Sequence, residues 1–118
     1  MNVEIADIAW SQVYDIAYYI EAEFGEKSRD KFLDDFDHTI YLLGINPYIG
    51  SKEPALAHRS IEYHSIIVAK KNKIIYNVVH SANEEDSYVK VVAFWDCRRN
   101  PKTLVSHIEH LTFPRHNP

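Results

Sequence analysis

The feature that most constrains the fold is a change in the spacing of apolar residues about halfway along the chain. In residues 9–43 apolar side chains recur every three or four positions, the period of an amphipathic α-helix. Residues 60–95 instead carry three short runs rich in Ile, Val, Tyr and Phe, separated by polar turns. A chain of 118 residues has room for one such domain, in which the helices pack on a sheet.

The helical half predicts two helices joined at a glycine. The apolar stripe of the first helix consists of Val13, Ile16, Ala17, Ile20 and Phe24. The stripe of the second consists of Phe32, Phe36, Ile40 and Leu43. Gly25 lies between the stripes, where glycine tolerates the left-handed conformation that ends a helix. The second helix ends at Asn46-Pro47, because a residue before proline is pushed out of the helical region. The two helices are expected to form an antiparallel hairpin.

Strand-forming segments flank these helices. Residues 3–8 alternate apolar and acidic side chains and predict a short first strand. Residues 60–68, 73–81 and 87–95 predict an antiparallel meander, in which the last run is apolar on both sides, as a central strand is. Residues 48–58 predict a loop, because proline and glycine interrupt any period there.

The predicted fold class is therefore α+β: an N-terminal strand, an antiparallel helical hairpin, and a three-stranded antiparallel meander that completes one sheet. Residues 101–111 predict a short terminal helix, so the single domain is expected to span residues 1–111. Residues 112–118 predict a frayed tail.

Cysteine usage and apolar run length bear on location. Cys97 is the one cysteine, so no internal disulfide can form, which favours a reducing compartment. The N-terminus lacks a basic region followed by an apolar run, and the longest apolar stretches fall far short of a membrane span. We therefore expect a cytoplasmic protein that makes no use of a membrane.

Charge is divided unevenly along the chain. The net charge of −4 argues against a nucleic-acid-binding protein. However, residues 1–46 carry −7 and residues 47–118 carry +3. The second half could therefore meet an acidic partner; alternatively, the acidic half only reflects exposed helix faces that favour Glu and Asp.

Several segments, taken in order, resemble one family of bacterial proteins. The first three are the tyrosine-rich first helix (14–20), the turn and start of the second helix (24–27 and 31–34), and the Asn-Pro exit of that helix (46–50). The others are the central hairpin (64–68 and 73–76) and the run Trp-Asp-Cys-Arg-Arg-Asn-Pro (95–101). In this order and spacing, they resemble the RelE/ParE superfamily of toxins from type II toxin–antitoxin systems, which includes ParE-like plasmid stabilisation proteins. The resemblance covers nearly the whole chain.

The resemblance implies one of two activities. RelE-like members cut messenger RNA on the ribosome and are enzymes, whereas ParE-like members bind DNA gyrase and have no known hydrolytic site. By resemblance, the catalytic candidates of a ribonuclease are His64, Lys73 and Arg98. Two further family positions carry Ile66 and Leu104, which cannot transfer a proton, and Arg98 cannot give up its proton at ordinary pH. The incomplete set favours the ParE-like activity.

The ParE-like interpretation implies a binding surface for the target or the antitoxin. Its expected residues are Lys70, Lys71, Lys73, Lys90, Trp95, Arg98 and Arg99, each of which could also be an ordinary solvated or core residue. The resemblance also implies a cognate antitoxin whose C-terminal segment covers the toxin's sheet. We therefore expect a patch formed by the hairpin strands and Arg98 to be exposed in the free protein. A degenerate family member that binds its antitoxin without toxicity is a third possibility.

No cofactor is expected, since the three glycines are too scattered for a phosphate-binding loop. His107 and His110 are three residues apart and His116 lies nearby, but no carboxylate or cysteine at a ligand spacing completes a metal site. We therefore predict no metal site. Cys97 lies beside two arginines, which can lower a thiol pKa, yet no base is placed to activate it. A structural role is expected for Cys97.

Overall fold

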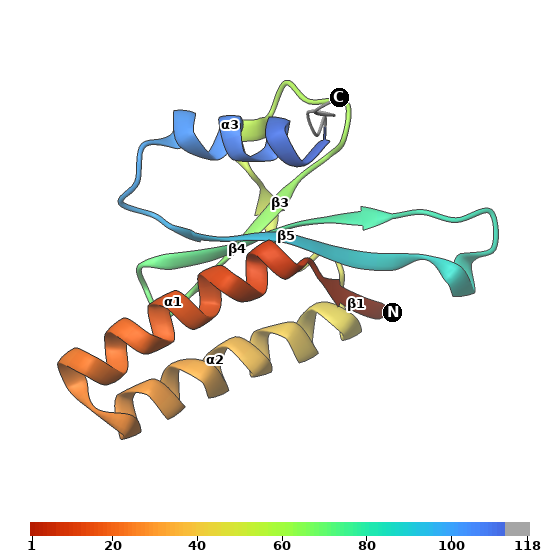
Figure 1. Ribbon diagram of the computed structural model, residues 1–118. Helices are drawn as coiled ribbons and strands as arrows, with labels where there is room; N and C mark the ends of the chain where they lie inside the picture. Colours follow the sequence, from red (N-terminus) through yellow and green to blue (C-terminus); the bar gives the residue numbers. More distant parts are fainter. Residues whose placement is uncertain (113–118) are drawn as a thin grey trace, which may run out of the picture.

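The computed structural model describes residues 1–112, in which helices and strands are arranged around one sheet (Figure 1). The N-terminal part contains strand β1 (Asn2–Ile5) and helices α1 (Asp7–Phe24) and α2 (Glu26–Ile45). The remaining elements are β2 (Ser51–Lys52), the 3-10 helix η1 (Pro54–Leu56), β3 (His64–Val68), β4 (Asn72–Val79), the 3-10 helix η2 (Glu84–Asp86), β5 (Tyr88–Asp96) and α3 (Pro101–Thr112). No helix among these residues is long and apolar enough to cross a membrane.

The sheet has five strands in the order β1-β5-β4-β3-β2 and is mixed. The predicted meander is confirmed, because β3, β4 and β5 pair antiparallel in sequence order. The N-terminal strand instead runs parallel to β5, since two helices carry the chain across between them. The short strand β2 and η1 lie within the segment predicted as a loop, because elements of two or three residues are too short to show a period.

Strand boundaries also differ from the predictions. The first strand ends at Ile5, and Ala6 precedes α1, so the strand predicted for residues 3–8 is too long at its C-terminal end. The strand predicted for residues 60–68 begins only at His64. Residues 60–63 belong to no strand, although the Tyr63 carbonyl oxygen accepts from the Glu53 N–H at 2.9 Å.

Gly25 has the conformation that the helical hairpin requires. Its φ of +94° lies in the positive region that glycine tolerates, and its N–H donates to Glu21 O at 2.9 Å. The same residue ends α1 and precedes α2, so the two helices meet at one position and pack side by side. The predicted role of this glycine as a helix terminator is confirmed.

The helical hairpin covers one face of the sheet. Its core contains buried residues of both helices and of β4 and β5, notably Val13, Phe36, Ile74, Val91 and Phe94. Phe32 and Phe36 both pack edge-to-face on Phe94, at centroid distances of 5.8 and 5.5 Å. This packing explains the apolar stripes of both helices.

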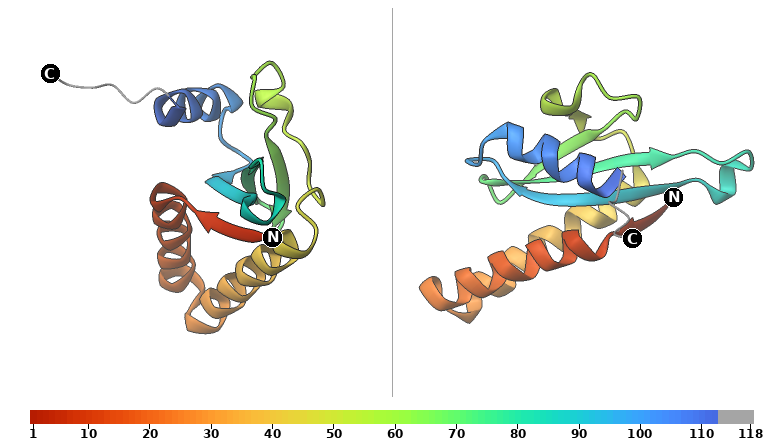
Figure 2. Two further views of the ribbon diagram at one scale, coloured as in Figure 1. Left: turned by 90° about the vertical axis from the view of Figure 1, so that its right-hand side faces the viewer. Right: turned by 45° about the horizontal axis from the view of Figure 1, so that its top comes forward.

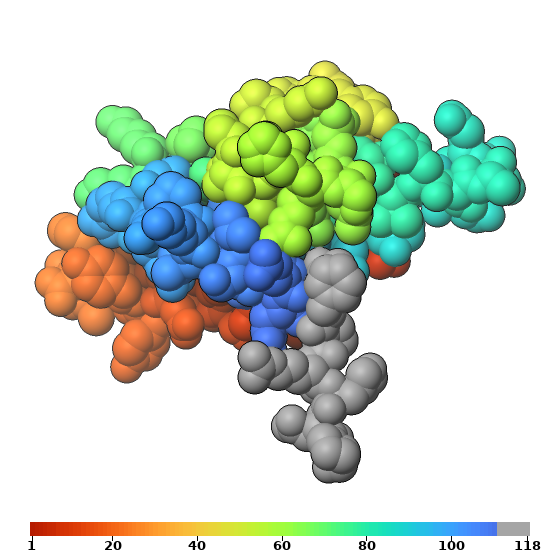
Figure 3. Space-filling model, turned by 90° about the horizontal axis from the view of Figure 1, so that it is seen from above, coloured from red at the N-terminus to blue at the C-terminus, as the bar shows by residue number. Residues whose placement is uncertain are grey.

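The other face of the sheet is covered by η1 and α3 (Figures 1 and 3). Leu104 and Ile108 of α3 are fully buried with Leu56 against Ile75 and Trp95 of the sheet. Arg59, just after η1, donates to Glu109 of α3 at 2.7 Å. Strand β5 is therefore buried on both faces, as its apolar pattern predicts.

The expectation of an exposed hairpin surface is wrong for most of β4 and correct only in part for β3. Ile74, Ile75 and Tyr76 are fully buried, whereas Ile67 is 58% exposed. Trp95 of the neighbouring strand β5 is only 3% exposed, because α3 covers it. Arg98 is exposed, as expected. The predicted tail lies outside the described residues from position 113 on, and Thr112 is the last residue of α3.

The turn between β3 and β4 provides a stability test. Ala69 and Lys70 both have positive φ, at 53° and 69°, which L-residues rarely adopt. Replacing Lys70 with glycine should stabilise the protein by about 0.5–1 kcal/mol, after the entropy cost of glycine is subtracted from the relief of strain. Lys71→Gly is the matched control, because Lys71 has no positive φ, and it should not stabilise. Urea denaturation measures the free energy of unfolding of both variants. Equal changes in the two would show that the backbone at Lys70 is not strained.

Candidate functional site

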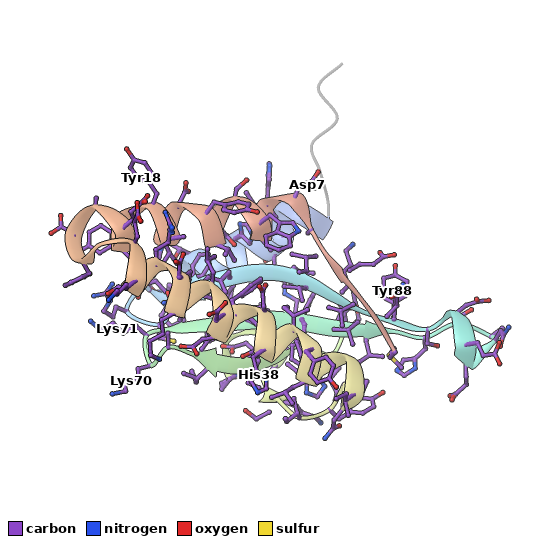
Figure 4. The ribbon with its side chains drawn as sticks, turned by 90° about the horizontal axis from the view of Figure 1, so that it is seen from below. Asp7, Tyr18, His38, Lys70, Lys71 and Tyr88 are labelled. Carbon is purple, nitrogen blue, oxygen red and sulfur yellow. The ribbon has the colours of Figure 1, made fainter. Side chains whose placement is uncertain are left out.

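A basic surface lies at the end of the sheet that carries the β3–β4 turn. Lys70 and Lys71 project from this turn, at the end opposite Tyr88 (Figure 4). Arg98 and Arg99 follow β5 and lie at the same end, because the Cys97 N–H donates to Lys71 O at 2.7 Å. We call Lys70, Lys71, Arg98 and Arg99 the basic end. All four side chains belong to exposed residues.

Asp96 partly neutralises this surface. The Arg98 guanidinium donates to Asp96 at 3.0 Å from Nε and 2.8 Å from Nη2. The hydrogen bonds from the side chain and backbone of Arg98 lower the pKa of Asp96 to about 2, so the carboxylate stays ionised. Arg99 lies over the Trp95 ring at 4.1 Å, a cation–π contact that fixes its position. The Arg99 side chain is thereby held in place at the rim of the sheet.

Lys73 does not belong to the basic end. Its Nζ donates to both carboxylate oxygens of Glu53, at 2.6 and 2.9 Å. Glu53 is only 2% exposed, and this lysine is its ion-pair partner. Lys73 is therefore a partner in a buried ion pair and neither a solvated strand residue nor a cation available to a substrate.

His64 is buried, with both ring nitrogens occupied. Nδ1 lies 3.3 Å from the carbonyl oxygen of Gly50, and Nε2 lies 3.2 Å from Oε2 of Glu62. The ring also stacks on Tyr76 at a centroid distance of 5.6 Å. His64 therefore has no free nitrogen with which to take a proton from a substrate.

The structure does not bring the three ribonuclease candidates together. His64 pairs across the strands with Tyr76, which belongs to the core under the helical hairpin. Lys73 pairs with Trp95, which belongs to the core under α3. Paired residues share a face, so His64 and Lys73 lie on opposite faces of the sheet. Arg98 lies beyond the strand end and is held by Asp96.

The other predicted residues are also dispersed. Lys90 is exposed on β5 opposite Asn77, away from the basic end, and Trp95 is buried. Cys97 is an exposed free cysteine, yet partial burial of its thiol raises the thiol pKa, the reverse of activation. Of the seven predicted binding residues, four form the basic end.

Sequence reasoning missed the residues around His64. Glu62, Tyr48 and Asn77 line an open pocket with it at the edge of the sheet. One signal was present, because Glu62 and His64 are two residues apart and would share a face of a strand. Tyr48 and Asn77 are brought there only by the tertiary fold.

No group of three histidine, cysteine or carboxylate side chains that could hold a metal ion occurs in residues 1–112. His107 packs on the Trp95 ring at 5.7 Å, whereas His110 is exposed, so the two do not form a pair of ligands. His116 lies outside the described residues. The chain matches no protein-family model, and no curated protein is significantly similar to it in sequence.

The Glu53–Lys73 pair gives a stability prediction. Lys73→Met should destabilise the protein by about 3–5 kcal/mol, because it leaves the buried Glu53 carboxylate without its partner. The double variant Glu53→Leu/Lys73→Met should recover most of that loss, since apolar residues can replace a buried pair. Urea denaturation measures both. A solvated Lys73 would instead give a change within about 0.5 kcal/mol.

His107 gives a pH prediction. Burial lowers its pKa below 6.5, and its Nε2 is buried without a hydrogen-bond partner among the described residues. His107 is therefore protonated more readily in the unfolded state than in the folded state. The free energy of unfolding should fall as the pH drops below about 6.5. His107→Gln should lose less stability between pH 7.5 and 5.5 than the wild type. His110→Gln is the control and should lose as much stability over this pH range as the wild type. If His107→Gln also loses as much stability as the wild type, His107 is not the group responsible.

Proposed function

We propose that this chain is a toxin of the RelE/ParE kind that acts by binding a macromolecular target, with DNA gyrase as the expected target. A cognate antitoxin would neutralise it. The proposal is supported by the agreement between the strand, helical hairpin and antiparallel meander of the structure and the arrangement expected from the resemblance. The observation that carries the choice of binding over cleavage is the separation of His64, Lys73 and Arg98.

Cleavage of RNA by its own 2′-hydroxyl needs a base, a stabilising cation and an acid around one phosphate. In this chain the nitrogens of His64 are occupied, and the charge of Lys73 is compensated by Glu53. Arg98 can stabilise negative charge but cannot act as an acid. These groups lie on two faces and one end of the sheet, so they cannot converge on one phosphate without rearrangement.

The basic end is suited to binding. No ion pair involves Lys70, Lys71 or Arg99 within residues 1–112, so three positive charges are available to a partner. Arg99 is positioned by Trp95 and the two lysines by a strained turn. Positive charge gathered at one end of an acidic chain steers an acidic partner to that end. Strain that persists in a turn of this kind is a feature of functional sites.

The same surface bears on the antitoxin. Because α3 covers one face of the sheet and the basic end is exposed, we place the contact with an antitoxin segment at the basic end. An acidic segment would neutralise Lys70, Lys71 and Arg99 and would compete with the target for them. In this proposal, the antitoxin neutralises the toxin by occupying the surface that would otherwise bind the target.

The test is induced expression in a bacterium, with assays of growth, DNA damage response and messenger RNA integrity. The wild type should arrest growth and induce DNA damage while transcripts stay intact. Lys71→Glu/Arg99→Glu should relieve the arrest and weaken binding to purified gyrase by about tenfold or more, since charge steering contributes 10–10³-fold to association.

Lys90→Glu is the control, because it reverses one positive charge elsewhere on the sheet; Lys71→Glu alone is the variant with the same charge change. Lys90→Glu should remain toxic. Arrest with cleaved transcripts and no DNA damage would replace the proposal with ribonuclease activity. Expression without growth arrest would contradict the proposed toxicity.

A further inference from the structure

The open pocket beside His64 lies at a step in the sheet. Pairing of β3 with β4 stops at Tyr76, whereas β4 and β5 continue to pair as a projecting hairpin (Figure 2). The pocket has a volume of about 410 Å³. It is lined by Tyr48, by residues 60–62 and His64 at the start of β3, and by the end of β4. That volume lies in the range of small-ligand sites.

Four side chains of this pocket are joined by direct contacts. Nε2 of His64 lies 3.2 Å from Oε2 of Glu62, and the His64 ring lies edge-to-face with the Tyr48 ring at a centroid distance of 6.0 Å. The Tyr48 hydroxyl in turn lies 3.3 Å from Nε2 of His80. The Glu62 carboxylate and the rings of Tyr48, His64 and His80 therefore converge on the same space.

The charge in the pocket is negative. Among the described residues that line it, Glu62 is the one carboxylate, and none is a lysine or arginine. The hydrogen bonds from Lys52 and His64 lower the pKa of Glu62, so the carboxylate stays ionised. Lys52, which does not line the pocket, binds Oε1 at 3.0 Å, but both side chains of this pair are largely exposed, and such pairs contribute little. The pocket therefore favours a positively charged ligand.

The free lone pairs of Glu62 match a planar cation. A carboxylate has about four acceptor sites, of which Lys52 occupies one on Oε1 and His64 one on Oε2. One site remains on each oxygen, which is the arrangement that accepts two parallel N–H groups of a guanidinium. Tyr48 is 53% exposed, so its ring offers an open surface in the same pocket, and guanidinium groups stack on such rings. An ammonium ion, which is not planar, would use only part of this arrangement.

We propose that this pocket binds a guanidinium group, with the Glu62 carboxylate accepting two of its N–H groups and the Tyr48 ring packed against its plane. His80 contacts the Tyr48 hydroxyl and His64 contacts Glu62, so both binding groups are positioned before the ligand arrives. The guanidinium belongs either to free arginine or to an arginine side chain of a partner. The site lies at the end of β3 opposite the basic end and does not rest on the proposed toxin activity.

The test is titration of the full chain with L-arginine and with citrulline, in which a neutral urea replaces the guanidinium, followed by NMR. Arginine should shift the Tyr48 ring signals and the backbone amides of residues 61–64. Citrulline should bind at least about tenfold more weakly, since hydrogen bonds between charged groups are the stronger ones. Equal binding of citrulline would overturn the proposal.

The capped tripeptide acetyl-Gly-Arg-Gly-amide distinguishes the two sources of the guanidinium. Binding as tight as that of arginine, or tighter, indicates the side chain of a partner, whereas weaker binding indicates the free amino acid. Absence of pocket shifts with both arginine and the tripeptide would overturn the proposal.

Variants at exposed positions test the roles of these groups while retaining the fold. Glu62→Gln keeps the shape of the side chain and should weaken arginine binding at least about tenfold, whereas Glu84→Gln, the same change on η2, should not. Lys52→Gln should tighten binding by about 1.5- to fivefold, because it removes a cation that competes for Glu62. Tyr48→Phe should retain binding that Tyr48→Leu loses. Undiminished binding in Glu62→Gln, or weaker binding in Lys52→Gln, would refute the assignment.

Discussion

The ion pair between Glu53 and Lys73 is the interaction on which the arrangement of the sheet's second face depends. Glu53 precedes η1, its N–H donates to Tyr63 O at 2.9 Å, and its buried carboxylate is satisfied by a lysine of β4. The pair therefore fastens η1 to the sheet. Helix α3 packs on η1, so the cover over Ile75 and Trp95 is assembled on that anchor.

The same interaction occupies one of the cations that the sequence offers for cleavage. A lysine bound to a buried carboxylate carries no net charge to a substrate, and its strand partner Trp95 is closed off by α3. Positive charge is left at the strand ends, where Lys70, Lys71 and Arg99 have no acidic partner among residues 1–112. Charge placed at a rim favours association over catalysis, and this distinction underlies the proposed binding function.

Periodicity predicted much of the fold because it reports burial directly. The stripes of α1 and α2, the role of Gly25, the β3–β4–β5 meander and the doubly apolar β5 all follow from local pattern. The site was harder to predict, because its contacts join distant residues. Lys73 pairs with Glu53, which lies in a segment that the sequence predicts only as a loop. His64 is buried by contacts with Gly50, Glu62 and Tyr76. Apart from the two-residue spacing of Glu62 and His64, neither spacing nor composition encodes these pairings.

Lys73 is locked in an ion pair with Glu53, whereas Lys70, Lys71 and Arg99 of the basic end have no acidic partner among the described residues. Limited acetylation of the folded protein, read by mass spectrometry at each lysine, measures this division directly. We expect rapid modification of Lys70 and Lys71, with Lys73 protected until the protein is denatured. Modification of Lys73 at the rate of Lys71 would contradict it, because the lysine would then be open to a substrate and cleavage would again be the better interpretation.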